Sequence, residues 1–352
     1  MDTIYMTYRL KTIAKPEKIE VWTGFDFKGR NGAYSQMKWN KDHFTGTDYD
    51  HRGKAKAVWQ FEGKFWANDV DEELGNYDYL HPEVRRDIAI WVMWLASQLK
   101  LGGLRLDAIK HYSGGFLREM LQHIDRTIGP DWFIVGEYWR EDSVVLAKYI
   151  EYMNHRISLF DVKLCSNFSR LSFQKDPDLR TVFEGTLASL KPQNTVSFVV
   201  NHDTTPVAPY FIPMAYSLIL LRADTGLPCV FYGDLYGCIE PEVDGRTFSS
   251  LASGGVLVPK LMLARKLYAY GSQLDYFDQT NCIGFTRTGH PSRSGGAGLA
   301  VVLTSGWTFA SKRIDVDIYD IKPRREGRRS MSSADEIRQS QSNATEPNAT
   351  NP

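Results

Sequence analysis

The sequence has few cysteines and no excess of charge of either sign. Four cysteines occur in 352 residues, without a CxxC pair or a histidine at zinc-ligand spacing: Cys165, Cys229, Cys238 and Cys282. This pattern argues against a zinc site and a disulfide scaffold, so we expect buried free thiols. Lys plus Arg and Asp plus Glu both number 42, which gives a formal net charge of zero. Proteins that bind nucleic acid usually carry a basic excess, so we expect no nucleic-acid partner.

Long apolar runs are also missing. No segment approaches the roughly 18 apolar residues that span a bilayer, so we expect no membrane partner. Residues 1–22 lack the uninterrupted apolar stretch of a secretory signal, which predicts a cytoplasmic location, or a secreted protein if further residues precede Met1. Hydrophobic residues make up 43% of the chain and charged residues 24%, which excludes disorder of the whole chain.

Predicted helices and strands alternate through the middle of the sequence. Five short apolar runs, typical of buried parallel strands, end near residues 107, 137, 162, 201 and 233. Their spacing of about 30 residues suits successive βα units. Apolar residues at helical spacing predict helices over 84–99, 116–128, 144–152, 179–190, 214–222 and 259–270. The alternation indicates an α/β fold with an open or closed sheet.

Composition divides the chain into four expected regions. Residues 1–80 carry turn residues and interleaved aromatics and are predicted to be β-rich. Residues 81–275 hold the alternating helices and strands. Residues 276–321 contain strand-like runs at 282–288 and 298–304, which indicate the start of a small β domain. Residues 322–352 are polar and poor in apolar side chains, so we expect a disordered tail.

Acidic residues stand at the ends of three predicted strands. Asp107, Glu137 and Asp203 each end a strand or follow it closely. In α/β barrels and open α/β sheets, functional groups lie at the carboxyl ends of the strands. A buried ion pair would explain any one of these acids, because a buried carboxylate needs a partner. Three acids on separate strands indicate a functional site.

The neighbours of two of these acids predict different protonation states. Arg105 stands two residues before Asp107, so both side chains lie on one face of the strand, and the guanidinium favours an ionised, nucleophilic carboxylate. Glu137 follows the apolar run 133–136, and burial raises the pKa of a glutamate, as a general acid requires. Two carboxyl groups with separated pKa values are the catalytic groups of glycoside hydrolysis.

Three short segments resemble motifs of one enzyme family. Residues 103–111 (GLRLDAIKH) resemble the second motif of the α-amylases, glycoside hydrolase family 13; residues 135–139 (VGEYW) resemble the third, and residues 198–204 (FVVNHDT) the fourth. The resemblance extends from about residue 15 to 305. It implies a (β/α)8 TIM barrel that is incomplete here, with only its last five strands present. The β-rich regions would then be a partial inserted domain and a truncated C-terminal β domain.

The resemblance implies retaining endo-hydrolysis of α-1,4-glucosidic bonds in starch or glycogen-like glucans. Asp107 would be the nucleophile, Glu137 the acid and then the base, and Asp203 a stabiliser of the transition state. A retaining mechanism places the nucleophile and acid carboxyl groups about 5–5.5 Å apart. Tyr138 and Trp139 are stacking candidates, although packing explains them equally well. The implied substrate-binding residues are Arg105, Lys110, His111, Tyr138, Trp139 and His202.

The same resemblance implies a structural calcium ion held by Asp78 and by the carbonyl of His111. The family's first motif has no match, and the segment 76–82 is shorter than in relatives, so a calcium-binding acid is missing. Calcium prefers six to eight oxygen ligands, so we expect an incomplete site. These gaps predict a truncated chain that is poorly stable, aggregates or needs a partner. A full-length protein is expected to be a monomer.

Three alternatives remain open from the sequence. The same site could transfer glucan chains to a sugar hydroxyl instead of to water. The missing first motif favours a catalytically dead remnant. A nucleotide-binding Rossmann enzyme has little support, because no GxGxxG follows a predicted strand and the glycine-rich run 294–298 precedes no helix.

Overall fold

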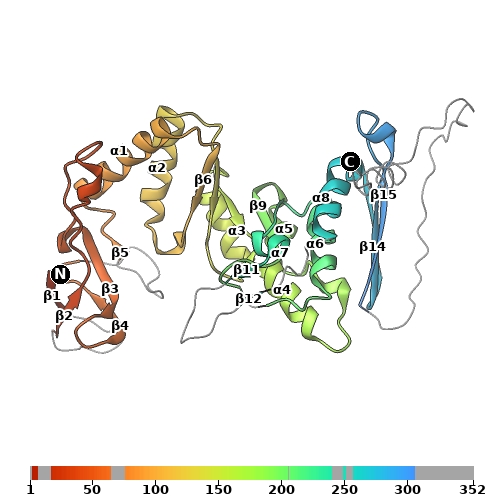
Figure 1. Cartoon of the computed structure of the whole chain (residues 1–352), viewed down its shortest axis with the longest axis horizontal. Helices are drawn as coiled ribbons and strands as arrows, with labels where there is room; N and C mark the ends of the chain where they lie inside the picture. Colours follow the sequence, from red (N-terminus) through yellow and green to blue (C-terminus); the bar gives the residue numbers. More distant parts are fainter. Residues whose placement is uncertain are drawn as a thin grey trace, which may run out of the picture. The chain divides into compact units, whose positions relative to one another are not determined.

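The structure is a computed structural model that describes residues 2–6, 17–64, 76–204, 206–239, 249–250 and 257–305 (Figure 1). All of them belong to one compact unit, residues 1–314. The predicted tail at 322–352, and the part of the C-terminal β region after residue 305, lie outside the described residues. The boundaries of the four regions expected from composition, at residues 80, 275 and 321, stay a prediction.

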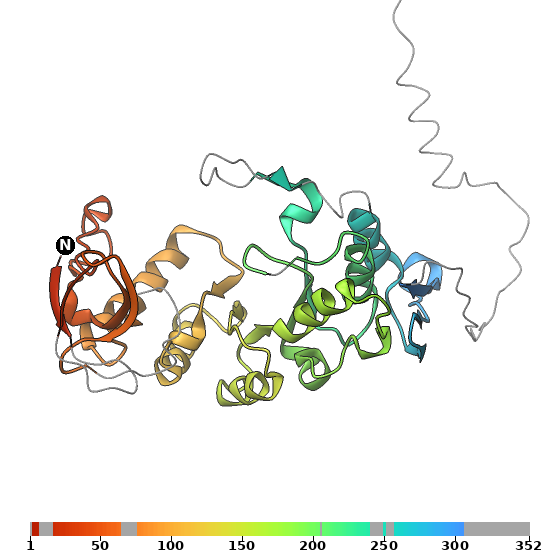
Figure 2. The same ribbon diagram turned by 90° about the horizontal axis from the view of Figure 1, so that it is seen from below.

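A five-stranded parallel sheet carries the predicted site. Its order is β10-β9-β8-β7-β6, so each strand lies beside its neighbour in sequence. Along the ribbon, helices separate each strand from the next (Figure 2), as in successive βα units. The five predicted strands are confirmed, and the sheet is consistent with an incomplete (β/α)8 barrel. The strands are β6 (Gly103–Leu106), β7 (Phe133–Gly136), β8 (Ser158–Phe160), β9 (Thr195–Phe198) and β10 (Leu227–Cys229).

The helices cover the sheet with apolar faces. In α2, Ser113 caps the first turn by accepting a hydrogen bond from the Phe116 N–H, and the buried side chains recur at helical spacing from Phe116 to Ile124. In α1, Pro82 occupies the first turn, as predicted. The α-helices are α1 (Pro82–Gln98), α2 (Gly114–Thr127), α3 (Ser143–Tyr152), α4 (Val162–Phe173), α5 (Leu187–Leu190), α6 (Ile212–Leu221), α7 (Tyr232–Tyr236) and α8 (Leu257–Tyr268). The 3-10 turns are η1 (Lys28–Arg30), η2 (Lys41–His43), η3 (Ile109–His111), η4 (Leu179–Thr181), η5 (Pro192–Asn194) and η6 (Ser294–Gly296).

The predicted helix over 179–190 is wrong. The main helix of this unit is α4, which starts directly after β8 because the side chain of Asp161 accepts the Leu164 N–H at 3.0 Å and caps the first turn. Between η4 and α5, Gly185 has a φ of 67° and Thr186 caps a new helix. A left-handed glycine followed by a capping threonine ends one helix and starts another.

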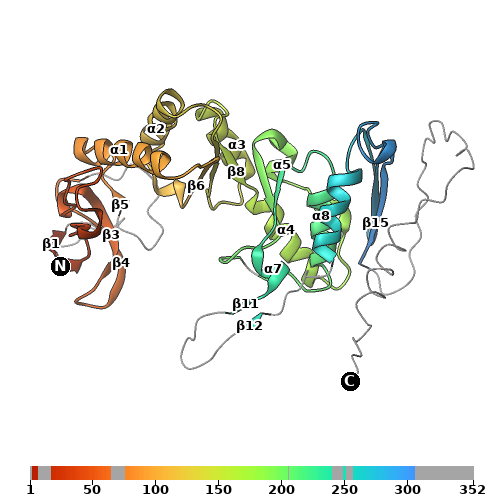
Figure 3. The ribbon, with the colours of Figure 1, turned by 45° about the horizontal axis from the view of Figure 1, so that its top comes forward.

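In the described part of residues 1–80, most regular structure is strand, in agreement with the predicted β-rich character (Figure 3). β1 (Asp2–Met6) pairs with β2 (Glu17–Val21), and a second sheet joins β4 (Ala55–Gln60), β3 (Phe44–Asp50) and β5 (Asn76–Tyr77) in that order. Their core includes Trp39, Phe44 and Trp59, and it also takes in Val84 of α1. This contact joins the β-rich region to the first helix of the βα units.

The described residues end in an antiparallel sheet of β13 (Gln273–Gln279), β14 (Cys282–Arg287) and β15 (Leu299–Thr304). The sequence predicted β14 and β15 but missed β13, whose side chains are all partly or fully exposed and leave little apolar signal. A small pair joins β11 (Cys238–Ile239) and β12 (Ser249–Ser250).

Two further observations concern the burial of the cysteines and the length of the apolar helices. Cys165 and Cys282 are buried free thiols, as expected, whereas Cys229 is exposed, so the expectation of buried thiols is wrong there. Cys229 belongs to β10, which is one of the two outer strands of the parallel sheet. Among the described residues, no helix combines the length and the apolar character that a membrane crossing requires.

Candidate active site

The carboxyl ends of β6 and β7 bring Asp107 and Glu137 together. The strands are parallel, and their register pairs Leu106 with Gly136, so the next residue on each strand is one of the two acids. The ladder continues past the strand ends, because the Glu137 N–H donates to the Leu106 carbonyl at 2.8 Å. Adjacent parallel strands with this register place the two carboxyl groups side by side.

Arg105 links the two acids. Its Nη1 lies 2.6 Å from Asp107 Oδ1, and its Nη2 lies 3.1 Å from Glu137 Oε2. The predicted pairing of Arg105 with Asp107 on one face of β6 is confirmed. The side chain of Asp107 is 62% exposed and that of Glu137 is 11% exposed, so the two carboxyl groups have different access to water.

The surroundings of Glu137 favour its neutral form. Burial raises its pKa above the ordinary value, hydrogen bonding from Ala108 and the charge of Arg105 lower it, and the neighbouring Asp107 carboxyl raises it again. The net direction is upward, as the apolar run before Glu137 predicted. A buried carboxyl with a raised pKa beside an exposed carboxylate is the arrangement of a general acid and a nucleophile.

Local backbone geometry fixes this pair. Ala108 has the left-handed conformation, with φ 47° and ψ 42°, which costs an alanine about 1–2 kcal/mol. In this conformation its N–H points at Glu137 Oε2, 3.2 Å away, and the chain continues into η3. The next N–H, of Ile109, donates to the Glu137 carbonyl at 2.9 Å. Backbone donors of Ala108 and Ile109, between the end of β6 and the start of η3, therefore hold both the side chain and the main chain of Glu137.

Asp203 stands on a loop after β9, two strands away from β7 in the sheet. Its N–H donates to Asn201 Oδ1 at 2.9 Å, and its carboxylate pairs with His202 Nε2 at 3.0 Å. Both side chains are more than half exposed. The structure thus places His202 beside Asp203, whereas the contacts of the Asp107–Glu137 pair described above involve neither residue.

The remaining predicted binding residues follow the same two strands. Lys110 and His111 belong to η3, directly after Asp107, and both are partly buried. Tyr138 packs against Tyr149 of α3, with ring centroids 5.0 Å apart. Trp139 lies 6.5 Å from the ring of Phe198 on β9. Tyr138 and Trp139 are thus half-buried, and each packs against another ring of the protein.

Sequence reasoning missed one aromatic residue near the pair. Tyr112 follows η3 directly and lies 5.5 Å from the ring of Tyr79. Burial, followed by the negative charge of Asp107, raises the pKa of Tyr112 to about 12. Its hydroxyl therefore stays neutral beside the acids. Nothing in the sequence distinguishes it from the other aromatics except its place five residues after Asp107.

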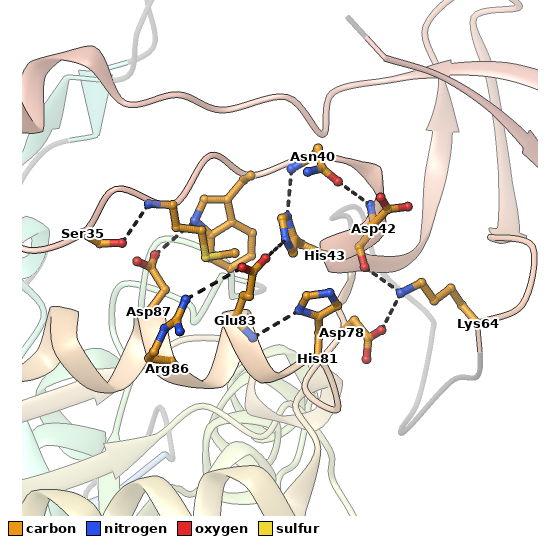
Figure 4. Close-up of polar contacts among 12 residues, drawn as sticks. Ser35, Asn40, Asp42, His43, Lys64, Asp78, His81, Glu83, Arg86 and Asp87 are labelled. Carbon is orange, nitrogen blue, oxygen red and sulfur yellow. Dashed lines mark hydrogen bonds and ion pairs between the residues drawn. The ribbon is translucent and has the colours of Figure 1, made fainter. Parts of the chain in front are cut away.

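The contacts of Asp78 do not fit a calcium site. Asp78 Oδ2 lies 2.7 Å from Lys64 Nζ (Figure 4). The other oxygen, Oδ1, accepts the Leu80 N–H at 3.1 Å. An ammonium group therefore occupies the side of the carboxylate where a cation would bind. His111, the other ligand implied by the resemblance, closes η3. Calcium needs six to eight oxygens, so the surroundings of Asp78 oppose the predicted site.

A second group of metal-type side chains lies close by, at the start of α1. Ligand atoms of His43, His81 and Glu83 come within 4.8 Å of one another. Backbone N–H groups donate to Nδ1 of both rings, from Asn40 to His43 at 3.0 Å and from Glu83 to His81 at 3.2 Å. A neutral ring that accepts at Nδ1 carries its proton on Nε2 and offers no second lone pair. This group is therefore built as a hydrogen-bond network rather than as a metal centre.

Comparison with known proteins agrees with this geometry. Residues 34–253 match the family described as "Alpha amylase, catalytic domain". The chain is 39% identical to an α-amylase of Bacillus licheniformis over 314 residues, which cover 85% of this chain and 60% of that protein. It is 38% identical to the cytoplasmic α-amylase of Escherichia coli, over 82% of this chain and 62% of that protein. The chain thus spans about 60% of the length of these relatives.

The fold has solved neighbours as well. An α-amylase from Anoxybacillus superposes with a TM-score of 0.51 at 20% identity, covering 62% of this chain and 52% of the other. At this identity the match concerns the fold alone. Its agreement with the parallel sheet, together with the family match over more than half of the residues, leads to one conclusion: the chain belongs to the α-amylase catalytic-domain family.

Proposed function

We propose that this protein is a retaining glycoside hydrolase that cleaves internal α-1,4-glucosidic bonds in starch or glycogen-like glucans. One observation carries the proposal: an arginine joins an exposed carboxylate, Asp107, to a buried carboxyl group, Glu137, whose pKa is raised. The names of the relatives, α-amylases from two bacteria, support the choice of substrate. The E. coli relative is named cytoplasmic, and we propose the same location here.

The chemistry assigned to the pair has two steps. In the first, an oxygen of Asp107 attacks the anomeric carbon while the bond to the leaving sugar breaks and Glu137 gives its proton to the glycosidic oxygen. In the second, the Glu137 carboxylate takes a proton from water, the water oxygen attacks the same carbon, and Asp107 leaves. Two inversions give net retention. Asp203 is proposed to stabilise the positively charged sugar ring in both steps.

The remaining assignments concern binding and organisation. Arg105 and His202 are proposed to hold the glucose unit under attack, and Lys110 and His111 to line the leaving-group side. Tyr138 and Trp139 are proposed to bound the sugar chain. Residues 1–80 would form part of an inserted domain, 81–275 the barrel part and 276–321 a C-terminal β domain. We propose a monomer as the working form of the full-length protein.

Hydrolysis of maltoheptaose by the purified chain tests the proposal. Asp107→Asn should lower kcat/KM at least about 10³-fold, because a neutral amide is a poor nucleophile. The matched control is Asp131→Asn, which removes an exposed carboxylate from the turn before β7 and should leave the rate unchanged. Full activity in Asp107→Asn would refute the nucleophile. Products longer than the substrate would indicate transfer to sugar, and an inactive wild-type chain would support the dead remnant.

A further inference from the structure

The ammonium group of Lys64 lies where a cation beside Asp78 would lie. Lys64 Nζ donates to Asp78 Oδ2 at 2.7 Å and to the main-chain oxygen of Asp42 at 2.6 Å (Figure 4). The side chains of Lys64 and Asp78 are only 21% and 13% exposed. This pair is therefore shielded from water, unlike an ordinary surface ion pair.

Lys64 itself is held from both sides. Its N–H donates to the Phe61 carbonyl at 3.0 Å, and its own carbonyl accepts a hydrogen bond from the side-chain amide of Gln60. These contacts fix the turn after β4, so the position of Nζ does not depend on a freely moving backbone. The ammonium joins three segments: η2, the turn after β4, and the link between β5 and α1.

The Asp78 carboxylate is satisfied without an ion. Its second oxygen, Oδ1, accepts the Leu80 N–H at 3.1 Å. The main chain of Asp78 is bonded too, since its N–H donates to the His43 carbonyl at 2.8 Å and its carbonyl accepts the His81 N–H at 2.9 Å. A divalent ion at this carboxylate would have to displace Lys64 Nζ and would leave a shielded ammonium beside a positive ion. Both changes cost free energy.

We propose that Lys64 serves as a built-in cation for Asp78, and that the junction between the β-rich region and α1 is therefore stable without calcium. Asp78 is the residue that the family resemblance assigns to a calcium ion. In this chain, the ammonium group of one lysine would take the place of that ion. The proposal concerns stability, and it is independent of the proposed catalytic activity.

Thermal unfolding of the purified chain, in EDTA and in excess calcium chloride, tests the proposal. The Tm of the wild type should be the same in both. Lys64→Ala should lower the Tm in EDTA by about 5–10 °C, because it leaves a largely buried carboxylate without its counter-charge. Calcium should restore part of this loss, because the vacated space exposes Asp78 Oδ2 and the Asp42 carbonyl.

The matched control is Lys41→Ala. Lys41 Nζ pairs with the Asp42 carboxylate at 2.6 Å, but both side chains are more than half exposed, so its loss should change the Tm little. A wild-type Tm that falls in EDTA, or a Lys64→Ala variant that melts like the wild type, would overturn the proposal.

If Lys64→Ala does not fold, equilibrium dialysis with calcium tests whether Lys64 keeps the ion away from Asp78. The wild type should bind no calcium that depends on Asp78. One calcium ion bound per wild-type chain and lost in Asp78→Asn would show that the ammonium does not exclude the ion.

Discussion

At the scale of single residues, Arg105 explains how two carboxyl groups can lie side by side. Two neighbouring carboxylates repel each other, and burial adds a cost for the one on β7. The guanidinium reaches both groups, at 2.6 Å and 3.1 Å, and so offsets part of this repulsion. Glu137 is buried, and burial raises its pKa, so its surroundings favour the protonated form that a general acid needs.

The pH profile of hydrolysis should reflect this assignment. Glu137 acts as an acid only while protonated, so kcat/KM should fall on the alkaline side as Glu137 loses its proton. Because its pKa is raised, this limb should lie above the ordinary glutamate value of 4.5. Initial rates on maltoheptaose between pH 4 and pH 9 measure it. An alkaline limb at or below the ordinary value would contradict the assignment.

The same group predicts how stability changes with pH. A glutamate with a raised pKa binds more protons in the folded state than in the unfolded state. Its contribution is therefore complete below the ordinary value of 4.5 and is lost as pH rises through the folded pKa. Glu137→Gln removes this loss, so the Tm of the variant should rise relative to that of the wild type as pH increases from 4 to 7. If the Tm of Glu137→Gln differed from that of the wild type by the same amount at pH 4 and at pH 7, the raised pKa of Glu137 would be refuted.

The sequence predicted this pair because the signal is local. Period-two spacing placed Arg105 beside Asp107, and an apolar run preceded Glu137. Asp161 shows the limit of such reasoning, because it also ends a strand, β8, but is fully buried. It accepts the N–H groups of Leu164 and Ala188 at 3.0 and 2.8 Å. Only the fold distinguishes a helix-capping acid from a catalytic one.

At the scale of elements, one glycine allows β6 to approach β7, and a second allows the end of β7 to pack against η3. A Cβ atom on Gly103 would lie 1.9 Å from the Phe133 carbonyl oxygen, and one on Gly136 would lie 2.4 Å from Ile109 Cδ1. Gly103 begins β6 and Gly136 ends β7. The β6–β7 pairing that brings Asp107 to Glu137 therefore depends on the absence of a side chain at Gly103.

Gly103→Ala should destabilise the fold by about 1–3 kcal/mol or more, because the obstacle is backbone that cannot rotate away. The neighbouring Gly102→Ala is the matched control, since a Cβ there meets nothing within 4 Å. Urea unfolding of both variants measures the difference in free energy. Equal stability of the two variants would show that β6 and β7 are not held this closely.

The elements were predictable where periodicity was strong. The five strands and helices such as α2 follow from apolar runs and from a regular buried face. The helix α4 was missed because Asp161 and Val162 read as the end of a strand, although Asp161 caps the helix that begins there. The strand β13 was missed because its side chains are partly or fully exposed along its length.

At the scale of the whole molecule, the described sheet has two outer strands, β6 and β10. The helix that precedes β6 in the chain, α1, also leaves large apolar side chains exposed, among them Trp91 at 38% and Met93 at 45%. Unpaired strand edges and exposed apolar faces favour association. The resemblance to an eight-stranded barrel predicted exposed strand edges. Hydrophobic periodicity alone did not, because it identifies strands but does not show which of them lack a neighbour.

The chain alone should therefore associate or aggregate at micromolar concentration. Size-exclusion chromatography with light scattering, repeated over a concentration series, measures this directly. A concentration-independent monomer with a sharp cooperative melt would show that the outer strands and α1 are protected in solution.

The central claim is that Asp107 forms a covalent bond to the sugar while Glu137 transfers protons. The most direct test is mass spectrometry of the Glu137→Gln variant after incubation with α-maltosyl fluoride, whose leaving group needs no acid. A maltosyl adduct should accumulate on the peptide that contains Asp107, and Asp107→Asn should abolish it. An adduct on another residue, or none while the fluoride is still hydrolysed, would contradict the central claim.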